Sequence, residues 1–106
     1  MTGAYGRRGR PEPPEPLGVP TGDAHTHLDA CGCVDAADVR AALDRAAAVG
    51  VTRVVTVADD LASARWVVDA AHWDDRVVAA VALHPTRTAS VTEADLAEIE
   101  QLARDP

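Results

Sequence analysis

Two hydrophobic patterns alternate along residues 19–106. Residues 51–58 and 76–83 are short, valine-rich runs that are almost continuously apolar, which is typical of strands buried on both faces of a parallel sheet. A weaker run over 22–27 also predicts a short strand, with a poorly defined start because Pro20 has no N–H for a strand ladder. The pattern therefore predicts three strands, each followed by a helical segment.

The helical segments are recognised by apolar side chains that recur every three or four residues. Asp35 is expected to cap the first helix and Gly50 to follow its end, while Asp59 or Asp60 is expected to cap the second. The third helix opens at residues 92–95 (TEAD), which is close to a capping box. The apolar stripes are Val39, Leu43 and Ala46, then Leu61, Ala64, Val68 and Ala71, then Leu96, Ile99 and Leu102.

Strand and helix follow each other three times, in units of about 30 residues, which predicts an α/β fold with parallel strands. The chain has 106 residues, well short of the ~250 of a complete eight-stranded barrel. We therefore expect the first three βα units of a partial TIM (β/α)8 barrel over residues 19–106. Residues 1–18 are rich in Gly, Pro, Arg and Glu and are expected to form a disordered tail.

The charge balance limits the possible chemistry. The formal net charge is −7, and every basic residue is arginine. The absence of lysine excludes a Schiff base, a P-loop lysine or a carbamylated lysine bridging metals within this stretch. An acidic body also does not attract nucleic acid through its overall field, so any phosphate binding has to be local or metal-mediated.

The chain holds two cysteines, Cys31 and Cys33, too few and too close together for a secreted disulfide framework. No apolar run reaches the length of a signal segment or a membrane span. We therefore expect a cytoplasmic protein with no membrane association. The cysteines could extend the nearby histidines into a zinc site, or could simply be two small loop residues, and the sequence leaves their role open.

The most informative string is DAHTHLD, residues 23–29. Alternate side chains of a strand share a face, so His25 and His27 are expected to lie side by side and to bind one divalent cation. Asp23 and Asp29 follow the same alternation and are predicted to accept hydrogen bonds from the imidazoles and so orient them. The alternative is a pair of exposed turn histidines.

A further histidine, His84, closes the third apolar run and is followed by Pro85. Barrel enzymes gather their active-site groups at the carboxyl ends of the strands, which is where His84 is expected to lie. Arg87, just beyond it, is a candidate for a phosphate contact. The alternative is a loop histidine ahead of a turn proline.

The segments DAHTHLD, GVTRVVTVADD and VALHP, with a capped acidic helix after the last, resemble the N-terminal part of TatD-type metal-dependent deoxyribonucleases over residues 22–106. The resemblance implies an α/β barrel that binds one or two divalent cations (Mg²⁺, Mn²⁺ or Zn²⁺) and hydrolyses phosphodiesters in DNA. It maps the first metal site onto His25 and His27, and an active-site histidine onto His84. Ala82 stands where the family usually has glycine.

The same resemblance implies further ligands, a bridging glutamate on a fourth strand and then two histidines and an aspartate, for which the chain up to Pro106 has no counterpart. We therefore expect an incomplete N-terminal part of such an enzyme, inactive on its own, with DNA or another phosphodiester as its partner. Two alternatives stay open. One is another barrel metallohydrolase that begins with Asp-x-His-x-His, such as an amidohydrolase or a PHP-type phosphoesterase, although the segment VALHP favours the TatD hypothesis. The other is a chain without catalysis. Metal identity and oligomeric state are also open.

Overall fold

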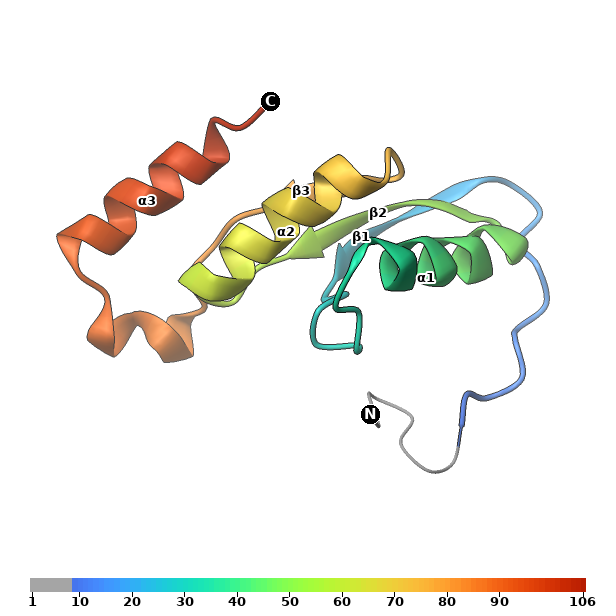
Figure 1. The fold of residues 1–106 in the computed structure, drawn as a ribbon. Coiled ribbons are helices and arrows are strands. Elements are labelled where there is room, and N and C mark those ends of the chain that lie inside the picture. The colour runs from blue at the N-terminus through green and yellow to red at the C-terminus, as the bar shows by residue number, and fades with distance from the viewer. Residues whose placement is uncertain (1–8) are drawn as a thin grey trace.

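The computed structural model describes residues 9–106 and shows strands alternating with helices along the chain (Figure 1). The strands pair in parallel in the order β1-β2-β3. This confirms the predicted α/β fold built from three βα units. The elements are β1 (Thr21–Thr26), α1 (Ala36–Ala48), β2 (Val51–Val57), α2 (Leu61–Trp73), β3 (Val77–Ala80), the 3-10 helix η2 (Pro85–Ser90) and α3 (Glu93–Ala103).

The third strand is shorter than the predicted run over residues 76–83. Its last ladder partner is Val57, the final residue of β2, which lies opposite Ala80. Residues 81–83 therefore continue without a partner strand. The 3-10 helix that follows was not predicted, but Pro85 at its first position suits the start of a helix, where a missing N–H costs little.

The predicted helix ends are confirmed at all three helices. The Asp35 carboxylate accepts a hydrogen bond from the N–H of Asp38, and Gly50 follows the end of α1 with a φ of +93°, which favours glycine. Of the two candidates for the second cap, Asp60 takes the role. Thr92 caps α3 in a reciprocal capping box, as residues 92–95 suggested.

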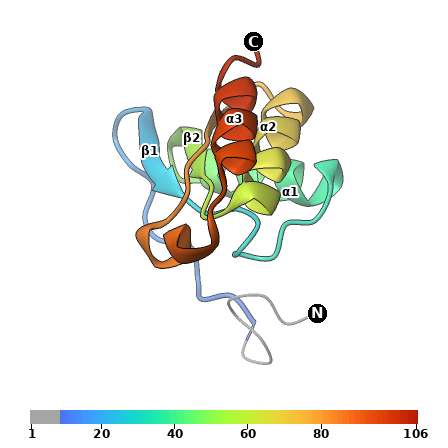
Figure 2. The ribbon, with the colours of Figure 1, turned by 90° about the vertical axis from the view of Figure 1, so that its left-hand side faces the viewer.

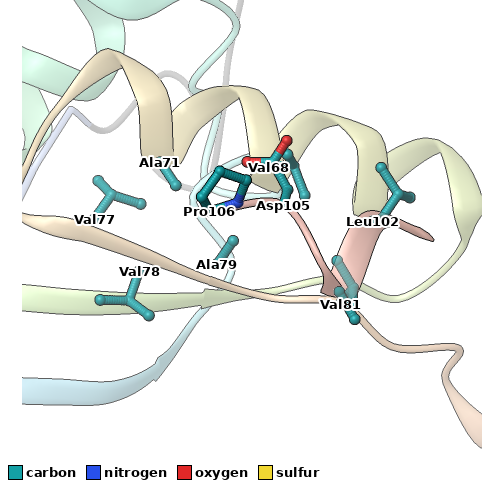
Figure 3. Close-up of a pocket in the computed structure, with 10 residues that line it drawn as sticks. Val68, Ala71, Val77, Val78, Ala79, Val81, Leu102, Asp105 and Pro106 are labelled. Atoms are coloured by element: carbon teal, nitrogen blue, oxygen red, sulfur yellow. The ribbon is translucent and has the colours of Figure 1, made fainter. Parts of the chain in front are cut away.

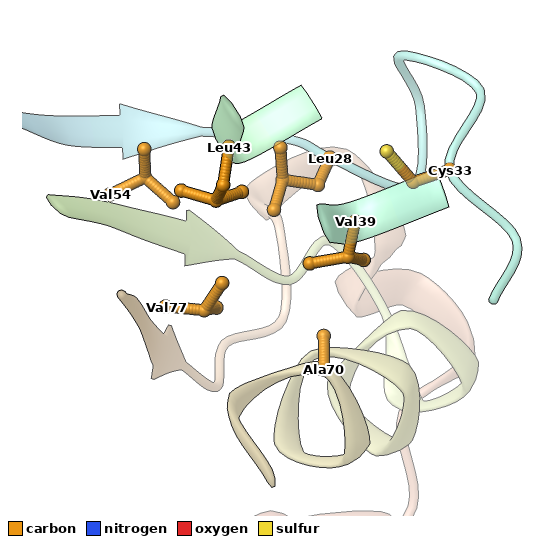
Figure 4. Close-up of a cluster of buried hydrophobic side chains, with 7 residues drawn as sticks. All are labelled: Leu28, Cys33, Val39, Leu43, Val54, Ala70 and Val77. Atoms are coloured by element: carbon orange, nitrogen blue, oxygen red, sulfur yellow. The ribbon is translucent and has the colours of Figure 1, made fainter. Parts of the chain in front are cut away.

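Helices α1 and α2 cover the same face of the sheet (Figure 2). Val39 and Leu43 of α1 are fully buried there, against strand residues such as Val54 (Figure 4). On the opposite face Val78 is 44% exposed; in a closed barrel this face is the interior. The main core cluster consists of Leu28, Cys33, Val39, Leu43, Val54, Ala70 and Val77.

Helix α3 does not contact the main core cluster but packs on α2. Its Ile99 and Leu102 lie against a second cluster that contains Ala64 and Val67 of α2. Between β3, α2 and the end of α3 is a mostly apolar hollow of about 290 Å³, lined among others by Val77 and Leu102 (Figure 3). It lacks histidine and cysteine, so it is not a candidate for metal chemistry.

The predicted tail falls partly outside the described residues, because residues 1–8 are not among them. Residues 9–18 contain no helix or strand, and the N–H of Leu17 donates a hydrogen bond to the carbonyl of Val49 at the end of α1 (2.9 Å). The division at residue 18 stays a prediction. Within residues 9–106, no helix is both long and apolar enough to cross a membrane.

An ion-pair network fixes the turn between α2 and β3. The Arg76 guanidinium donates to both carboxylate oxygens of Asp74, at 2.9 and 2.7 Å, and also to Asp44 at 3.0 Å. These hydrogen bonds from Arg76 hold the pKa of the Asp74 carboxyl below its ordinary value. The folded state therefore binds this proton less readily than the unfolded chain does.

We predict that this pair contributes stability above about pH 4, the ordinary range of an aspartate, and that the contribution is lost as the pH falls through the lowered pKa of Asp74. Asp74→Asn should reduce the free energy of unfolding at pH 7 by about 1 kcal/mol and flatten its decrease in acid. Urea denaturation at a series of pH values measures both effects. Asp75→Asn, the same change at the exposed neighbour, is the control, and equal pH profiles for the two variants would contradict the prediction.

Candidate metal centre at the carboxyl ends of the strands

The two histidines of the DAHTHLD string lie next to each other at the end of β1. The ring centroids of His25 and His27 are 5.1 Å apart, with an angle of 68° between the ring planes. Two imidazoles that bind one zinc ion at about 2.1 Å in tetrahedral geometry have their centroids roughly 5 Å apart. The spacing of the pair therefore suits a single shared cation.

The hydrogen bonding of His27 determines which of its nitrogens is available. Its Nδ1 lies 2.8 Å from the carbonyl oxygen of Val57, the last residue of β2. A carbonyl can only accept, so Nδ1 carries the proton and donates it. The lone pair is then on Nε2, which is free to bind a metal, and a backbone carbonyl is a common partner of such a ligand.

Within residues 9–106, neither of the two carboxylates predicted to orient these rings makes a hydrogen bond to an imidazole. The Asp23 carboxylate accepts from the backbone N–H of His25 (3.1 Å) rather than from an imidazole. The β1–β2 register shifts between Asp23 and Thr26. The rule that alternate residues share a face therefore does not hold from Asp23 to His25. Asp29 lies in the turn after β1 and lines an open hollow. Their predicted role stays a prediction.

His84 lies after β3 and caps η2. Its backbone N–H donates to the carbonyl of Asp59, which follows β2, at 2.6 Å. Its Nδ1 accepts from the backbone N–H of Thr86 at 3.2 Å, and the Thr86 hydroxyl lies 2.8 Å from the same nitrogen. An amide N–H can only donate, so Nδ1 carries the lone pair and the ring proton is on Nε2. His84 therefore offers a donor, the opposite of His27.

The open hollow at this edge of the sheet has a volume of about 490 Å³. Its lining includes three carboxylates, those of Asp29, Asp59 and Asp60, and one basic side chain, Arg87, which lies 3.9 Å from Asp60. Hydrogen bonds from Ser63 at the start of α2 lower the pKa of the Asp60 carboxyl, so this carboxylate is ionised at neutral pH. The lining of this hollow, which includes none of the three site histidines, therefore carries net negative charge.

One carboxylate near His27 was not assigned to it from the sequence. Asp59 was expected as one of two candidate caps of α2. Its Oδ1 instead lies 3.9 Å from Nδ1 of His27. The two residues follow neighbouring strands, β1 and β2, and the rule that parallel strands end at one edge of a sheet is the signal that could have predicted their contact.

Other candidate residues are explained by packing. Cys33 belongs to the core, where burial raises the pKa of its thiol, and Cys31 is exposed. Within residues 9–106, no three side chains of His, Cys, Asp or Glu converge closely enough to hold a metal ion. Trp66 and Trp73, which are seven residues apart in α2, pack edge to face with their ring centroids 5.8 Å apart.

The fold and the histidines define the class of protein. Parallel βα units that present paired histidines at the carboxyl edge are typical of barrel hydrolases, which assemble their active sites there. The family model described as "TatD related DNase" matches residues 22–106. The chain therefore belongs to the TatD family, and the match contains both members of the histidine pair as well as His84.

A protein of Mycobacterium tuberculosis described as "Uncharacterized metal-dependent hydrolase TatD" is 67% identical to this chain over 84 residues. The aligned segment covers 79% of this chain and 32% of that relative. The chain thus spans about a third of the length of the curated relative that it matches.

We predict opposite tautomers for two of the histidines, with the neutral His27 ring protonated on Nδ1 and the neutral His84 ring on Nε2. Long-range ¹H–¹⁵N NMR spectra of the ¹⁵N-labelled chain distinguish the two forms. His25 is the internal control, since its ring makes no hydrogen bond within the described residues, and it should populate both tautomers. Protonation of His27 on Nε2 would contradict the assignment of that nitrogen to a metal.

Proposed function

We propose that the chain provides the first metal site of a metal-dependent phosphodiesterase that acts on DNA, with His25 and His27 as ligands of a divalent cation (Mg²⁺, Mn²⁺ or Zn²⁺). The observation that carries the proposal is the pair of adjacent rings, one of which has Nε2 freed by a hydrogen bond on its other nitrogen. Family membership supports it, because the matched segment contains both residues.

A cation bound there would lower the pKa of a water molecule and neutralise charge on the phosphate. The protein's own groups have separate tasks. His27 offers a lone pair on Nε2, while His84 offers the N–H of its Nε2 as a hydrogen-bond donor for a phosphate oxygen. We assign His84 to the substrate side of the site for this reason. Asp23 and Asp29 keep the proposed role of orienting the imidazoles when the site is complete.

The charge of the site supports a cation as intermediary between protein and DNA. The Asp59 carboxylate lies 3.9 Å from Nδ1 of His27 and also lines the neighbouring hollow, and the chain carries a net charge of −7. Bare phosphates would be repelled by such an edge. Arg87, which is exposed, is the basic side chain in this lining and a candidate for a local phosphate contact.

The proposal includes inactivity of the 106-residue chain on its own. Two imidazoles are fewer ligands than a hydrolytic site needs, and the described residues supply no third.

Family membership favours the TatD assignment over an amidohydrolase or a PHP-type phosphoesterase. Cytoplasmic location is part of the same proposal, supported by two cysteines that are both free.

Removal of either ligand tests the assignment directly. His25→Ala and His27→Ala, placed in a full-length version of the protein, should each reduce Mn²⁺-dependent DNA hydrolysis and Mn²⁺ affinity by more than about 100-fold. Nuclease assays and isothermal titration with Mn²⁺ measure the two effects. His72→Ala is the matched control, because this exposed histidine pairs with Asp105 at the end of the chain. Wild-type rates and affinities in both ligand variants would refute the proposal.

The donor role of His84 is tested by two replacements in the same full-length protein. Gln places an amide N–H near the position of Nε2. Asn instead places an amide oxygen near the position of Nδ1, where it can accept from the N–H of Thr86 but leaves no donor at the position of Nε2. We expect His84→Asn to lower kcat/KM for DNA by roughly 100-fold or more and His84→Gln to lower it less, with Mn²⁺ affinity unchanged in both. A large loss of Mn²⁺ affinity in both variants would instead identify His84 as a ligand.

A further inference from the structure

The carboxylate of Asp59 lies beside the ring of His27. Its Oδ1 lies 3.9 Å from Nδ1, and the side chains of His27 and Asp59 are 33% and 39% exposed. Both groups are thus partly withdrawn from water, which strengthens an electrostatic interaction between them. The distance is longer than a hydrogen bond, because the carbonyl of Val57 takes the Nδ1 proton at 2.8 Å.

The backbone of Asp59 is fixed from two sides. Its N–H donates to the hydroxyl of Ser63 (2.7 Å), and its carbonyl accepts from the N–H of His84 (2.6 Å). Helix capping, the role expected for it, belongs to Asp60, whose Oδ1 accepts from the N–H of Ser63 (2.8 Å). The Asp59 carboxylate makes no hydrogen bond within residues 9–106 and stays available to His27.

We propose that Asp59 is a positioning residue for the metal site, acting through His27. Its negative charge faces the Nδ1–H of the ring, so it favours the tautomer that leaves the lone pair on Nε2. It also stabilises the partial positive charge that the ring acquires when Nε2 binds a cation, as carboxylates behind metal-bound histidines do. This inference rests on the proposed function and adds a residue to it.

Asp59 acts behind the ring and is not a ligand in this arrangement. Its carboxylate approaches Nδ1, whereas the nitrogen offered to the cation is Nε2. The same residue also joins the two halves of the site, since its side chain faces His27 while its carbonyl holds the backbone of His84. A neutral side chain at this position would keep the second contact and lose the first.

Asp59→Asn and Asp60→Asn form a matched pair for the test. Both remove one negative charge from neighbouring positions, and Asn caps a helix as well as Asp does, so the fold is preserved in each. Isothermal titration with Zn²⁺, on the 106-residue chain and on a full-length version, should show an affinity about tenfold lower for Asp59→Asn and nearly unchanged for Asp60→Asn. Thermal unfolding midpoints should stay alike.

The metal-free chain gives an independent readout. In ¹H–¹⁵N spectra the population of His27 protonated on Nε2 should rise several-fold in Asp59→Asn and stay at the wild-type level in Asp60→Asn. Equal tautomer populations and equal Zn²⁺ affinities in the two variants would overturn the inference. The proposed function fails separately, if His27→Ala binds Zn²⁺ as the wild type does.

Discussion

The arrangement of the site depends on the parallel pairing of β1 with β2. Thr26 lies opposite Thr56, and beyond that point side chains continue the ladder: the Thr56 hydroxyl accepts from the N–H of Leu28, and His27 donates from Nδ1 to the carbonyl of Val57. Thr56 is fully buried, so its hydroxyl has to find partners within the protein. The contact that holds the His27 imidazole is thus an extension of the sheet itself.

Two histidines at this edge of the sheet have opposite hydrogen-bonding roles at Nδ1. His27 meets a carbonyl and becomes a donor on Nδ1, whereas His84 meets the amide of Thr86 and becomes an acceptor there. A backbone group sets the direction of the Nδ1 hydrogen bond in both rings, and the proposed effect of Asp59 adds to it at His27. The opposite tautomers of the two rings are therefore built into the fold.

The sequence predicted what local rules control. Strand alternation predicted that His25 and His27 lie side by side, and their ring centroids are 5.1 Å apart, but the same alternation could not relate Asp23 to them across the register shift. The end of β3 at Ala80 is set by the length of its partner strand. Asp59 was expected to cap a helix, and its contact with His27 arises from two strands packed side by side.

Further strands on this sheet would serve both its stability and its chemistry. The face of the sheet opposite α1 and α2 leaves Val78 44% exposed, and the described residues supply two imidazoles but no third ligand. In a closed barrel, further strands complete the sheet around that face, and their carboxyl ends lie at the same edge as those that carry His25 and His27. On the proposed assignment of His25 and His27, strands that cover the apolar face would also bring further ligands to the cation, so a change that loosens their pairing would weaken metal binding as well.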